Sequence, residues 1–543
     1  MLRRALTLLV VLAPVALPAQ ADLPARVDNI FARFDRNTPG CAVGLGKDGK
    51  TLYTHGYGSA NLEYSVPLTD SSVMESGSVA KQFTAAALVL LQNDGKLSLD
   101  DDIRKYLPEV PDFGKMITIR NLITHTSGLR DQWGLLAIEG RGAGTQVHSP
   151  MTTLDLVVHQ KALNFAPGSA YLYSNTGYAL ASIIVARVSG VSFQAFTQER
   201  LFRPLGMTHT QWRDDFTRVV PNRATAYAPS ATGFEMDMPF TNMIGNGGLL
   251  STMSDLLKWN ENFDHTTVGG PTFTETMQTQ MTLTSGRTIA YALGVSRVDY
   301  GGVREVSHGG STAGYRTFLA RYPDQHVSVA VWCSNASTNP TALAHEVADL
   351  VLNTPARAPV AVAPLAKLTS AELSQWVGLY RDAVTDQAID IAVADTVLKG
   401  GNVVMIPTGP GAFRSAQGTG SFTGTGEHRA FFLARADGDT SHFEIVRRAP
   451  AAVRFSDYTG RYASDELDVV LTMVVRDGQL VVKRRPNDDI ALKPAYLDGF
   501  QGTSGLTSVR FSRDGKGTVT GFSIFAGRVL DVRFKRLKER TRT

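Results

Sequence analysis

The sequence is poor in cysteine, with only Cys41 and Cys333 among 543 residues. Two cysteines cannot build the disulfide framework of a small secreted domain or supply the thiolates of a structural zinc site. No histidines stand at the spacing of a metal site, and no glycine-rich phosphate loop follows an expected strand. We therefore expect neither a metal nor a cofactor.

The chain also has little excess charge. Its formal net charge is +4, and two of the positive charges, Arg3 and Arg4, lie within the first 21 residues. Nucleic-acid-binding domains carry a clustered excess of lysine and arginine. We therefore expect no nucleic-acid partner.

The N-terminus carries an apolar run that is too short for a confident membrane span. It extends from Ala5 to Leu17, after Arg3 and Arg4 and before Ala19-Gln20-Ala21. This layout is typical of a secretory signal peptide with an A-x-A cleavage site. We expect residues 1–21 to be removed, leaving a secreted, periplasmic protein with no integral membrane segment.

The length is too great for a single hydrophobic core. A Pro/Ala-rich stretch, residues 355–368, is a candidate linker after a first domain of residues 22–354. Beyond it, short alternating strands dominate, and Leu373–Tyr380 recurs weakly as Phe455–Tyr462. We predict two small antiparallel barrels, residues 369–450 and 451–543, because closure removes exposed strand edges.

The first domain has strand patterns at both ends and helices between them, which predicts one sheet closed by its two ends. The expected strands are 41–46, 51–58, 303–311, 315–322 and 327–333, with terminal helices at 27–38 and 341–352. The glycine-rich stretch 131–149, which holds Trp133, is predicted to be a mobile loop.

Ser78 and Lys81 open an apolar stretch that predicts a buried helix over 78–92. A serine three residues before a lysine places both side chains on one helix face, with the hydroxyl near the positive end of the helix dipole. This pair suits a nucleophile and its base if burial lowers the pKa of the lysine. The alternative is a chance tetrad in which the serine only caps the helix.

Two further stretches stand beside predicted elements. Tyr173-Ser174-Asn175 precedes an apolar helix, and His308-Gly309-Gly310-Ser311 lies on a strand. Taken singly, Tyr173 could be a surface aromatic, Asn175 a helix cap and His308 a satisfied core histidine.

Together, the three stretches resemble the active-site motifs of the penicillin-recognising serine hydrolases. The closest likeness is to the class C β-lactamase branch, which also holds carboxypeptidases, esterases and D-aminopeptidases. His125–Leu129 and Gly247–Ser251 also resemble signatures of this family. The resemblance covers residues 25–352 and implies an α/β β-lactamase/transpeptidase-like fold, an antiparallel sheet flanked by helices, here followed by two small all-β, lipocalin-like barrels.

The resemblance also implies roles. Ser78 would form an acyl-enzyme, while Lys81 and Tyr173 would share the proton transfers and His308 would complete the catalytic set. Asn175 would bind the substrate amide, and the backbone N–H groups of Ser78 and Ser311 would form the oxyanion hole. Glycines 309 and 310 would let the substrate approach the strand edge closely.

The third motif departs from the β-lactamase pattern, which makes some functions of the family less favoured. β-Lactamases of this family usually carry Lys-Thr-Gly where this chain has His308-Gly-Gly, and neutral imidazole is a poorer partner for a substrate carboxylate. His-x-Gly, together with Ser127–Asp131 and the two barrels, resembles the D-aminopeptidases. We predict a serine hydrolase of small amides or short peptides. The alternatives are an esterase or β-lactamase of the same fold, an acyl-binding sensor without turnover, or a structural cell-wall protein.

Two hypotheses concern distant segments. Cys41 and Cys333 lie on strands that are neighbours in the family sheet, so they could pair; the alternative is two buried small residues. The glycine-rich segment 407–418 could be a barrel loop that caps the cleft and restricts substrate size.

Overall fold

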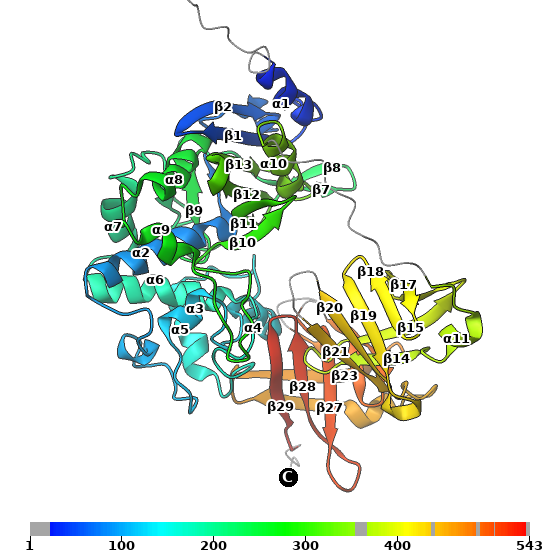
Figure 1. Ribbon diagram of the computed structural model, residues 1–543. Coiled ribbons are helices and arrows are strands. Elements are labelled where there is room, and N and C mark those ends of the chain that lie inside the picture. Colours follow the sequence, from blue (N-terminus) through cyan, green and yellow to red (C-terminus); the bar gives the residue numbers. More distant parts are fainter. Residues whose placement is uncertain (1–21, 353–365, 436–439, 485–488, 504, 539–543) are drawn as a thin grey trace, which may run out of the picture.

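The computed structural model describes residues 22–352, 366–435, 440–484, 489–503 and 505–538. The expected signal peptide, residues 1–21, and most of the expected linker, residues 355–365, lie outside them. The described chain forms an α/β domain followed by two closed β-barrels (Figure 1).

The α/β domain is built on a six-stranded antiparallel sheet in the order β10-β11-β12-β13-β1-β2. The strands are β1 Cys41–Lys47, β2 Lys50–Tyr57, β10 Ser296–Tyr300, β11 Val303–Thr312, β12 Tyr315–Tyr322 and β13 Val327–Cys333. Asp48 and Gly49 join β1 to β2 with positive φ angles of 51° and 73°, as a tight hairpin turn requires. Strands from both ends of the domain meet at β1 and β13, as predicted.

The register of β1 and β13 places Cys41 directly opposite Cys333, and the two form a disulfide. The pairing hypothesis is therefore confirmed. The bridge joins residues 292 positions apart, so it removes much of the conformational freedom of the unfolded chain.

Helices cover both faces of the sheet. Helices α1 Leu23–Phe31 and α10 Pro340–Asp349 pack on one face, and α8 Met253–His265 lies against β1 and β13 on the other. Helix α1 starts and ends before the predicted 27–38. Pro24 occupies its first turn, and its buried side chains, Leu23, Val27 and Phe31, recur every fourth residue.

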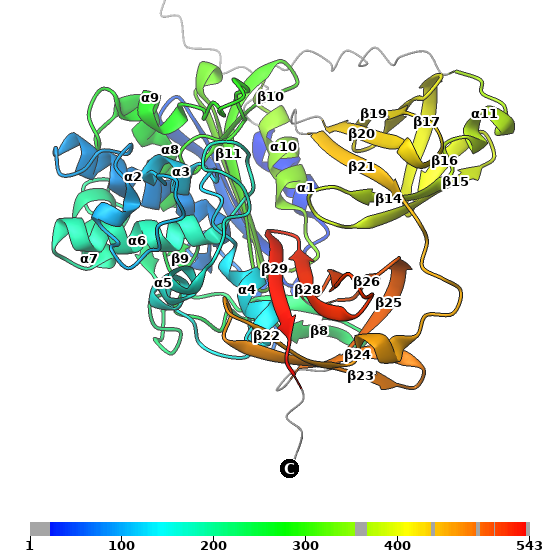
Figure 2. The same ribbon diagram turned by 90° about the horizontal axis from the view of Figure 1, so that it is seen from below.

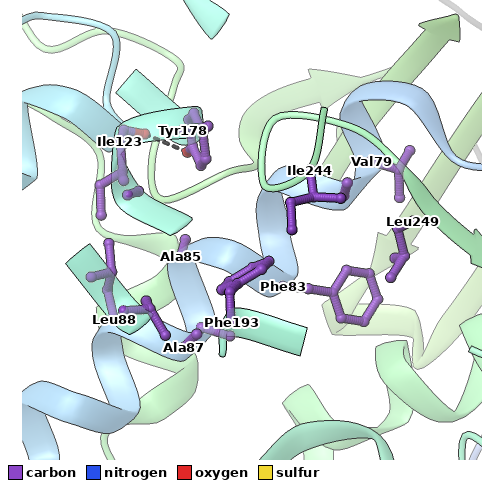
Figure 3. Packing of buried hydrophobic residues seen from close by; sticks show 14 of the residues in the cluster. Val79, Phe83, Ala85, Ala87, Leu88, Ile123, Tyr178, Phe193, Ile244 and Leu249 are labelled. Carbon is purple, nitrogen blue, oxygen red and sulfur yellow. Dashed lines mark hydrogen bonds between the residues drawn. The ribbon is translucent and has the colours of Figure 1, made fainter. Parts of the chain in front are cut away.

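The largest core cluster includes buried side chains of α8. It joins α2 Lys81–Asn93 to α6 Asn175–Ser189, and Figure 3 shows Phe83, Ala85 and Leu88 of α2 among its members. The Tyr178 hydroxyl of α6 donates to the Ile123 carbonyl oxygen at 2.5 Å, so this buried polar atom is satisfied. Helix α2 is buried from Lys81 to Leu91, which keeps its first turn fixed.

The remaining elements of this domain are short. The helices are η1 Gly77–Ala80, η2 Ile103–Lys105, α3 Ile119–Ile123, α4 Gln132–Glu139, α5 Pro150–His159, α7 Phe193–Thr197, η3 Gln198–Phe202, α9 Phe273–Gln278 and η4 Pro323–Gln325. The strands are β3 Ser59–Asn61, β4 Val66–Pro67, β5 Met74–Glu75, β6 Gln211–Trp212, β7 Tyr227–Ser230, β8 Gly233–Met236 and β9 Leu249–Ser251.

Two closed eight-stranded antiparallel barrels follow, as predicted. After α11 Ser370–Ser374, the first contains β14 Gly378–Asp382, β15 Ala388–Ala394, β16 Val397–Gly400, β17 Val403–Gly409, β18 Ala412–Ser415, β19 Gly418–Thr423, η5 Gly426–His428, β20 Ala430–Arg435 and β21 Thr440–Val446. The second contains η6 Phe455–Tyr458, β22 Gly460–Ser464, β23 Val469–Arg476, β24 Gln479–Lys483, β25 Ile490–Tyr496, β26 Gly499–Gln501, β27 Ser508–Arg513, β28 Val519–Ala526 and β29 Val529–Arg536.

The segment 407–418 is not a loop, so that prediction is wrong. It holds the end of β17, the whole of β18 and the start of β19. Its glycines serve the tight strand connections, where Gly411 has a φ of 70°, while Phe413 is buried in the barrel core.

The prediction of a loop over 131–149 is also wrong at its start, where α4 forms. The Asp131 side chain caps α4 by accepting from the Trp133 N–H, and Gly140 ends it with a φ of 81°. Leu135, Leu136 and Ile138 are buried in the core cluster of the second barrel, which Figure 2 shows beside α4. The second barrel therefore buries the apolar face of α4, and the sequence around α4 gives no sign of this partner.

The second barrel is the one that docks on the α/β domain. The Arg130 guanidinium donates to the Glu466 carboxylate at 2.8 Å and to the Leu530 carbonyl oxygen at 3.1 and 3.0 Å. The first barrel rests on the second, where the Asp386 carboxylate accepts from Tyr496, Ser508 and Arg510.

Within the described ranges, no single helix is long and apolar enough to cross a membrane; α6 passes such a test only together with Phe193–Phe202, at a bend of 80°.

Candidate active site

Ser78 lies in the single turn η1, directly before α2, so Lys81 is the first residue of the α-helix. The Lys81 Nζ and Ser78 Oγ atoms are 3.0 Å apart. The spacing that suggested a shared helix face therefore corresponds to a direct contact between the two side chains.

Lys81 is fully buried, and Nζ also donates to the Asn175 Oδ1 atom at 3.0 Å and to the Asn246 carbonyl oxygen at 2.7 Å. Burial lowers the pKa of Lys81 well below its ordinary value; Asp131 opposes this shift and Arg528 adds to it. A neutral amine has two N–H donors and one lone pair. When its two donors bond the carbonyl oxygens, this neutral form leaves its lone pair for the Ser78 hydroxyl.

Tyr173 lies beside this pair, with its hydroxyl buried and, within the described chain, without a hydrogen-bond partner. Its ring packs on His125 at a centroid distance of 4.0 Å, and the Arg528 guanidinium lies 4.6 Å from the ring centroid. Burial raises the pKa of Tyr173, while Ser78 and Arg528 offset only part of the shift. The side chain is therefore a neutral phenol that can donate its proton.

Asn175 connects Lys81 to a carboxylate. Its Nδ2 donates to the Asp131 Oδ2 atom at 3.0 Å, and its backbone N–H donates to the same oxygen at 2.7 Å. Asn175 lines the cleft, but it also orients Lys81, a role that the motif comparison did not assign.

His308 lines the same cleft, yet both of its ring nitrogens have partners. Nδ1 lies 2.5 Å from the Gly309 carbonyl oxygen and must donate, so Nε2 accepts from the Tyr291 hydroxyl at 2.9 Å. Burial, and next the charge of Lys81, lower the pKa of His308 to about 4. The lone pair of the neutral imidazole is thus engaged by Tyr291, and the catalytic role expected for His308 stays a prediction.

The buried state of His308 predicts acid sensitivity. The unfolded chain takes up a proton on this histidine near pH 6.5, whereas the folded protein stays neutral down to about pH 4. Stability present above pH 6.5 is therefore lost as the pH falls to 4, by up to about 3 kcal/mol. His308→Gln should flatten the dependence of the free energy of unfolding on pH in this window. The same change at exposed His428 should leave the slope intact; an unchanged slope in His308→Gln would contradict the assignment.

The backbone around Ser78 and Ser311 is held close by glycines. A Cβ atom on Gly310 would lie 3.0 Å from the Ser78 nitrogen and would collide with the Ser76 carbonyl oxygen, and one on Gly77 would lie 2.6 Å from the Ser311 nitrogen. Gly310 is thus needed for β11 to pack on η1. Gly309 has room for a side chain, since its Cβ would meet nothing nearer than 3.8 Å.

These groups surround a cleft of about 570 Å³. It is lined by Ser78, Tyr173, Asn175 and 308–311, with Trp133, Arg316 and Arg528 beside them, while Lys81 lies beneath. Sequence reasoning missed His125, Asp131 and Asn246 as supporting residues, although the first two belonged to motifs that it singled out. Arg528 carried no local signal, because its partners lie in another domain.

The chain is similar to known proteins in the α/β domain and, for some of them, over most of its length. The family model described as Beta-lactamase matches residues 27–353. A D-aminopeptidase from Brucella anthropi is 27% identical over 536 residues, which cover 92% of this chain and 96% of that protein.

Solved structures show the same fold. An octameric penicillin-binding protein homologue from Pyrococcus abyssi is 22% identical, with a TM-score of 0.55 over 86% of this chain and 98% of its own. A D-amino acid amidase from Ochrobactrum anthropi SV3 is 21% identical, with a TM-score of 0.52 over 61% of this chain and 98% of its own.

Proposed function

The chain belongs to the Beta-lactamase family, as its motifs predicted, and is a serine hydrolase; we propose that it cleaves small amides or short peptides with an N-terminal D-residue through a Ser78 acyl-enzyme. The observation that carries this proposal is the Ser78–Lys81 contact at 3.0 Å, together with the burial that lowers the pKa of Lys81 and so favours the neutral amine that a base requires. The substrate class rests on the D-aminopeptidase relatives, whose similarity extends through both barrels.

In acylation, Ser78 Oγ attacks the scissile carbonyl carbon as its proton passes to Lys81 Nζ. The carbonyl oxygen gains negative charge and accepts from the N–H groups of Ser78 and Ser311, whose backbones lie close together where Gly77 and Gly310 meet. Asn175 keeps Lys81 aligned through its Oδ1 atom.

The tetrahedral intermediate then breaks its C–N bond. The Tyr173 hydroxyl gives its proton to the leaving nitrogen and regains one from the Lys81 ammonium, which returns the base to its neutral form. In deacylation, a water molecule attacks the ester carbon, Lys81 takes the water proton, and this proton returns to Ser78 Oγ as the acid product leaves.

The site of action is the periplasm in this proposal. The N-terminal 21 residues have the layout of a signal peptide, and the Cys41–Cys333 disulfide suits an oxidising compartment.

The test is turnover of the mature protein on D-alanine and L-alanine p-nitroanilides, p-nitrophenyl butyrate and nitrocefin, with Ser78→Ala as control. We expect kcat/KM for the D-amide to exceed that for the L-amide by at least about a hundredfold, since a misplaced reacting group costs this much in rate. Cleavage of the butyrate ester alone would make the protein an esterase, and cleavage of nitrocefin alone a β-lactamase. A stable acyl adduct by mass spectrometry, without turnover, would make it an acyl-binding sensor.

A further inference from the structure

The cleft contains a charged residue that the second barrel supplies. Arg528 lies in the turn between β28 and β29, lines the cleft, and places its guanidinium over the ring of Tyr173. The barrel is therefore part of the wall of the active site.

The turn that carries Arg528 is fixed to the α/β domain on both sides. The Arg528 carbonyl oxygen accepts from Asn164 Nδ2 at 3.0 Å, and the Leu530 N–H donates to Asn164 Oδ1 at 2.9 Å. The Arg130 guanidinium donates to the Leu530 carbonyl oxygen. The position of Arg528 is thus built by contacts between the two domains.

Among the described residues, the Arg528 guanidinium makes no hydrogen bond or ion pair, and it lies 4.6 Å from the centroid of the Tyr173 ring. The other charged residues in the cleft lining have hydrogen-bond partners within the described chain. Glu75 is buried and pairs with Arg213 at 2.7 Å, while Arg316 donates to the carbonyl oxygens of residues 313 and 315. Among the described lining residues, the one carboxylate is thus paired, and neither Arg316 nor Arg528 has a carboxylate partner; of these two arginines, Arg528 is the one that lies over Tyr173.

We propose that Arg528 binds a carboxylate on the leaving residue of the substrate, so that preferred substrates end in a free C-terminal carboxylate one residue after the scissile bond. The inference rests on the proposed function, in which Tyr173 protonates the leaving nitrogen. Because Arg528 sits on the face of that tyrosine, it lies on the leaving-group side of the reacting carbonyl. A guanidinium binds a carboxylate through two parallel, charge-assisted hydrogen bonds.

The experiment compares substrates that differ only in this charge. D-alanyl-glycine and D-alanyl-glycinamide share the scissile bond, but only the first carries a carboxylate. We expect wild-type kcat/KM to favour the carboxylate by about 10–100-fold, the range of a charge-assisted hydrogen bond. Arg528→Met should remove this preference by slowing the carboxylate substrate about 10–100-fold more than the amide substrate, and Arg528→Lys should restore part of it. Arg476→Met removes a barrel arginine that pairs with Asp489 and should behave as wild type.

A second pair separates this inference from the proposed function. 3-Carboxyphenyl butyrate and 3-carbamoylphenyl butyrate share an acyl group without a D-residue. If neither peptide is cleaved but the carboxylate ester is preferred and Arg528→Met abolishes the preference, the D-residue assignment fails and the inference stands. Titration calorimetry of the Ser78→Ala variant measures the affinity for each of the two peptides. It compares the carboxylate with the amide without turnover.

The proposal would be overturned if Arg528→Met lowered kcat/KM equally for both members of each substrate pair and displaced the pH profile. Arg528 would then act on Lys81 and Tyr173 alone. An unchanged preference would overturn it as well.

Discussion

Ser78→Ala and Lys81→Met are each expected to lower kcat by about 10⁴–10⁶, the cost of removing a nucleophile or the base that activates it. The double variant should lose no more than either single one, because the two groups act in one step. Methionine keeps the length of the lysine side chain while removing the amine that contacts Ser78 at 3.0 Å. The measurement is single-turnover acylation by mass spectrometry together with kcat on the best substrate of the panel.

The control is Lys96→Met, an exposed lysine just after the same helix, which should leave kcat unchanged. Lys81→Met also leaves the Asn175 and Asn246 carbonyl oxygens without their donor, so its circular dichroism and melting temperature must be recorded. Acylation at a near wild-type rate in folded Lys81→Met would exclude the lysine as base and point to Tyr173.

Glu466→Ala is expected to have the largest effect on stability, a loss of about 3–5 kcal/mol in the first unfolding transition. The Arg130 and Glu466 side chains are only 2% and 7% exposed, and removing the carboxylate leaves a buried guanidinium uncompensated. Arg130→Met combined with Glu466→Leu should recover much of the loss, since a buried pair can be replaced by apolar groups. Denaturant unfolding of the wild type, Arg130→Met, Glu466→Leu and the combined variant in a double-mutant cycle gives the coupling energy.

A matched surface pair provides the comparison. Arg447 and Glu427 also lie 2.8 Å apart but are 78% and 76% exposed, so Glu427→Ala should cost about 0–1 kcal/mol. If Glu466→Ala costs no more than Glu427→Ala, the buried pair does not hold the barrel on the α/β domain. Loss of docking should also weaken the preference for a substrate carboxylate, because Asn164 and Arg130 together position the turn of Arg528.

Local patterns were reliable where burial and function act over a few residues. The spacing of Ser78 and Lys81, the strands around Cys41 and Cys333, and the weak repeat at 373–380 and 455–462 all indicated features that the structure contains. In each case, neighbouring residues in the chain lie on one helix face or in one strand. Their spacing in the sequence therefore predicts where their side chains lie.

The predictions were wrong where a high glycine content was taken to indicate a loop. At 131–149, Gly140 ends α4, whose Leu135, Leu136 and Ile138 pack in the core cluster of the second barrel. At 407–418, Gly411 serves a strand turn, and Phe413 packs in the core of the first barrel. Without those partners in view, both segments resemble loops.

The sequence by itself determined the two barrels, the outline of the sheet and the three short motifs that carry the chemistry, because these depend on periodicity and on neighbouring residues. The tertiary structure decided the rest. Burial lowers the pKa of Lys81, two hydrogen bonds occupy His308, Asn246 accepts from the lysine, and a turn of the second barrel brings Arg528 into the cleft. Each of these depends on which distant groups share one low-dielectric space, and that follows only from how the domains pack.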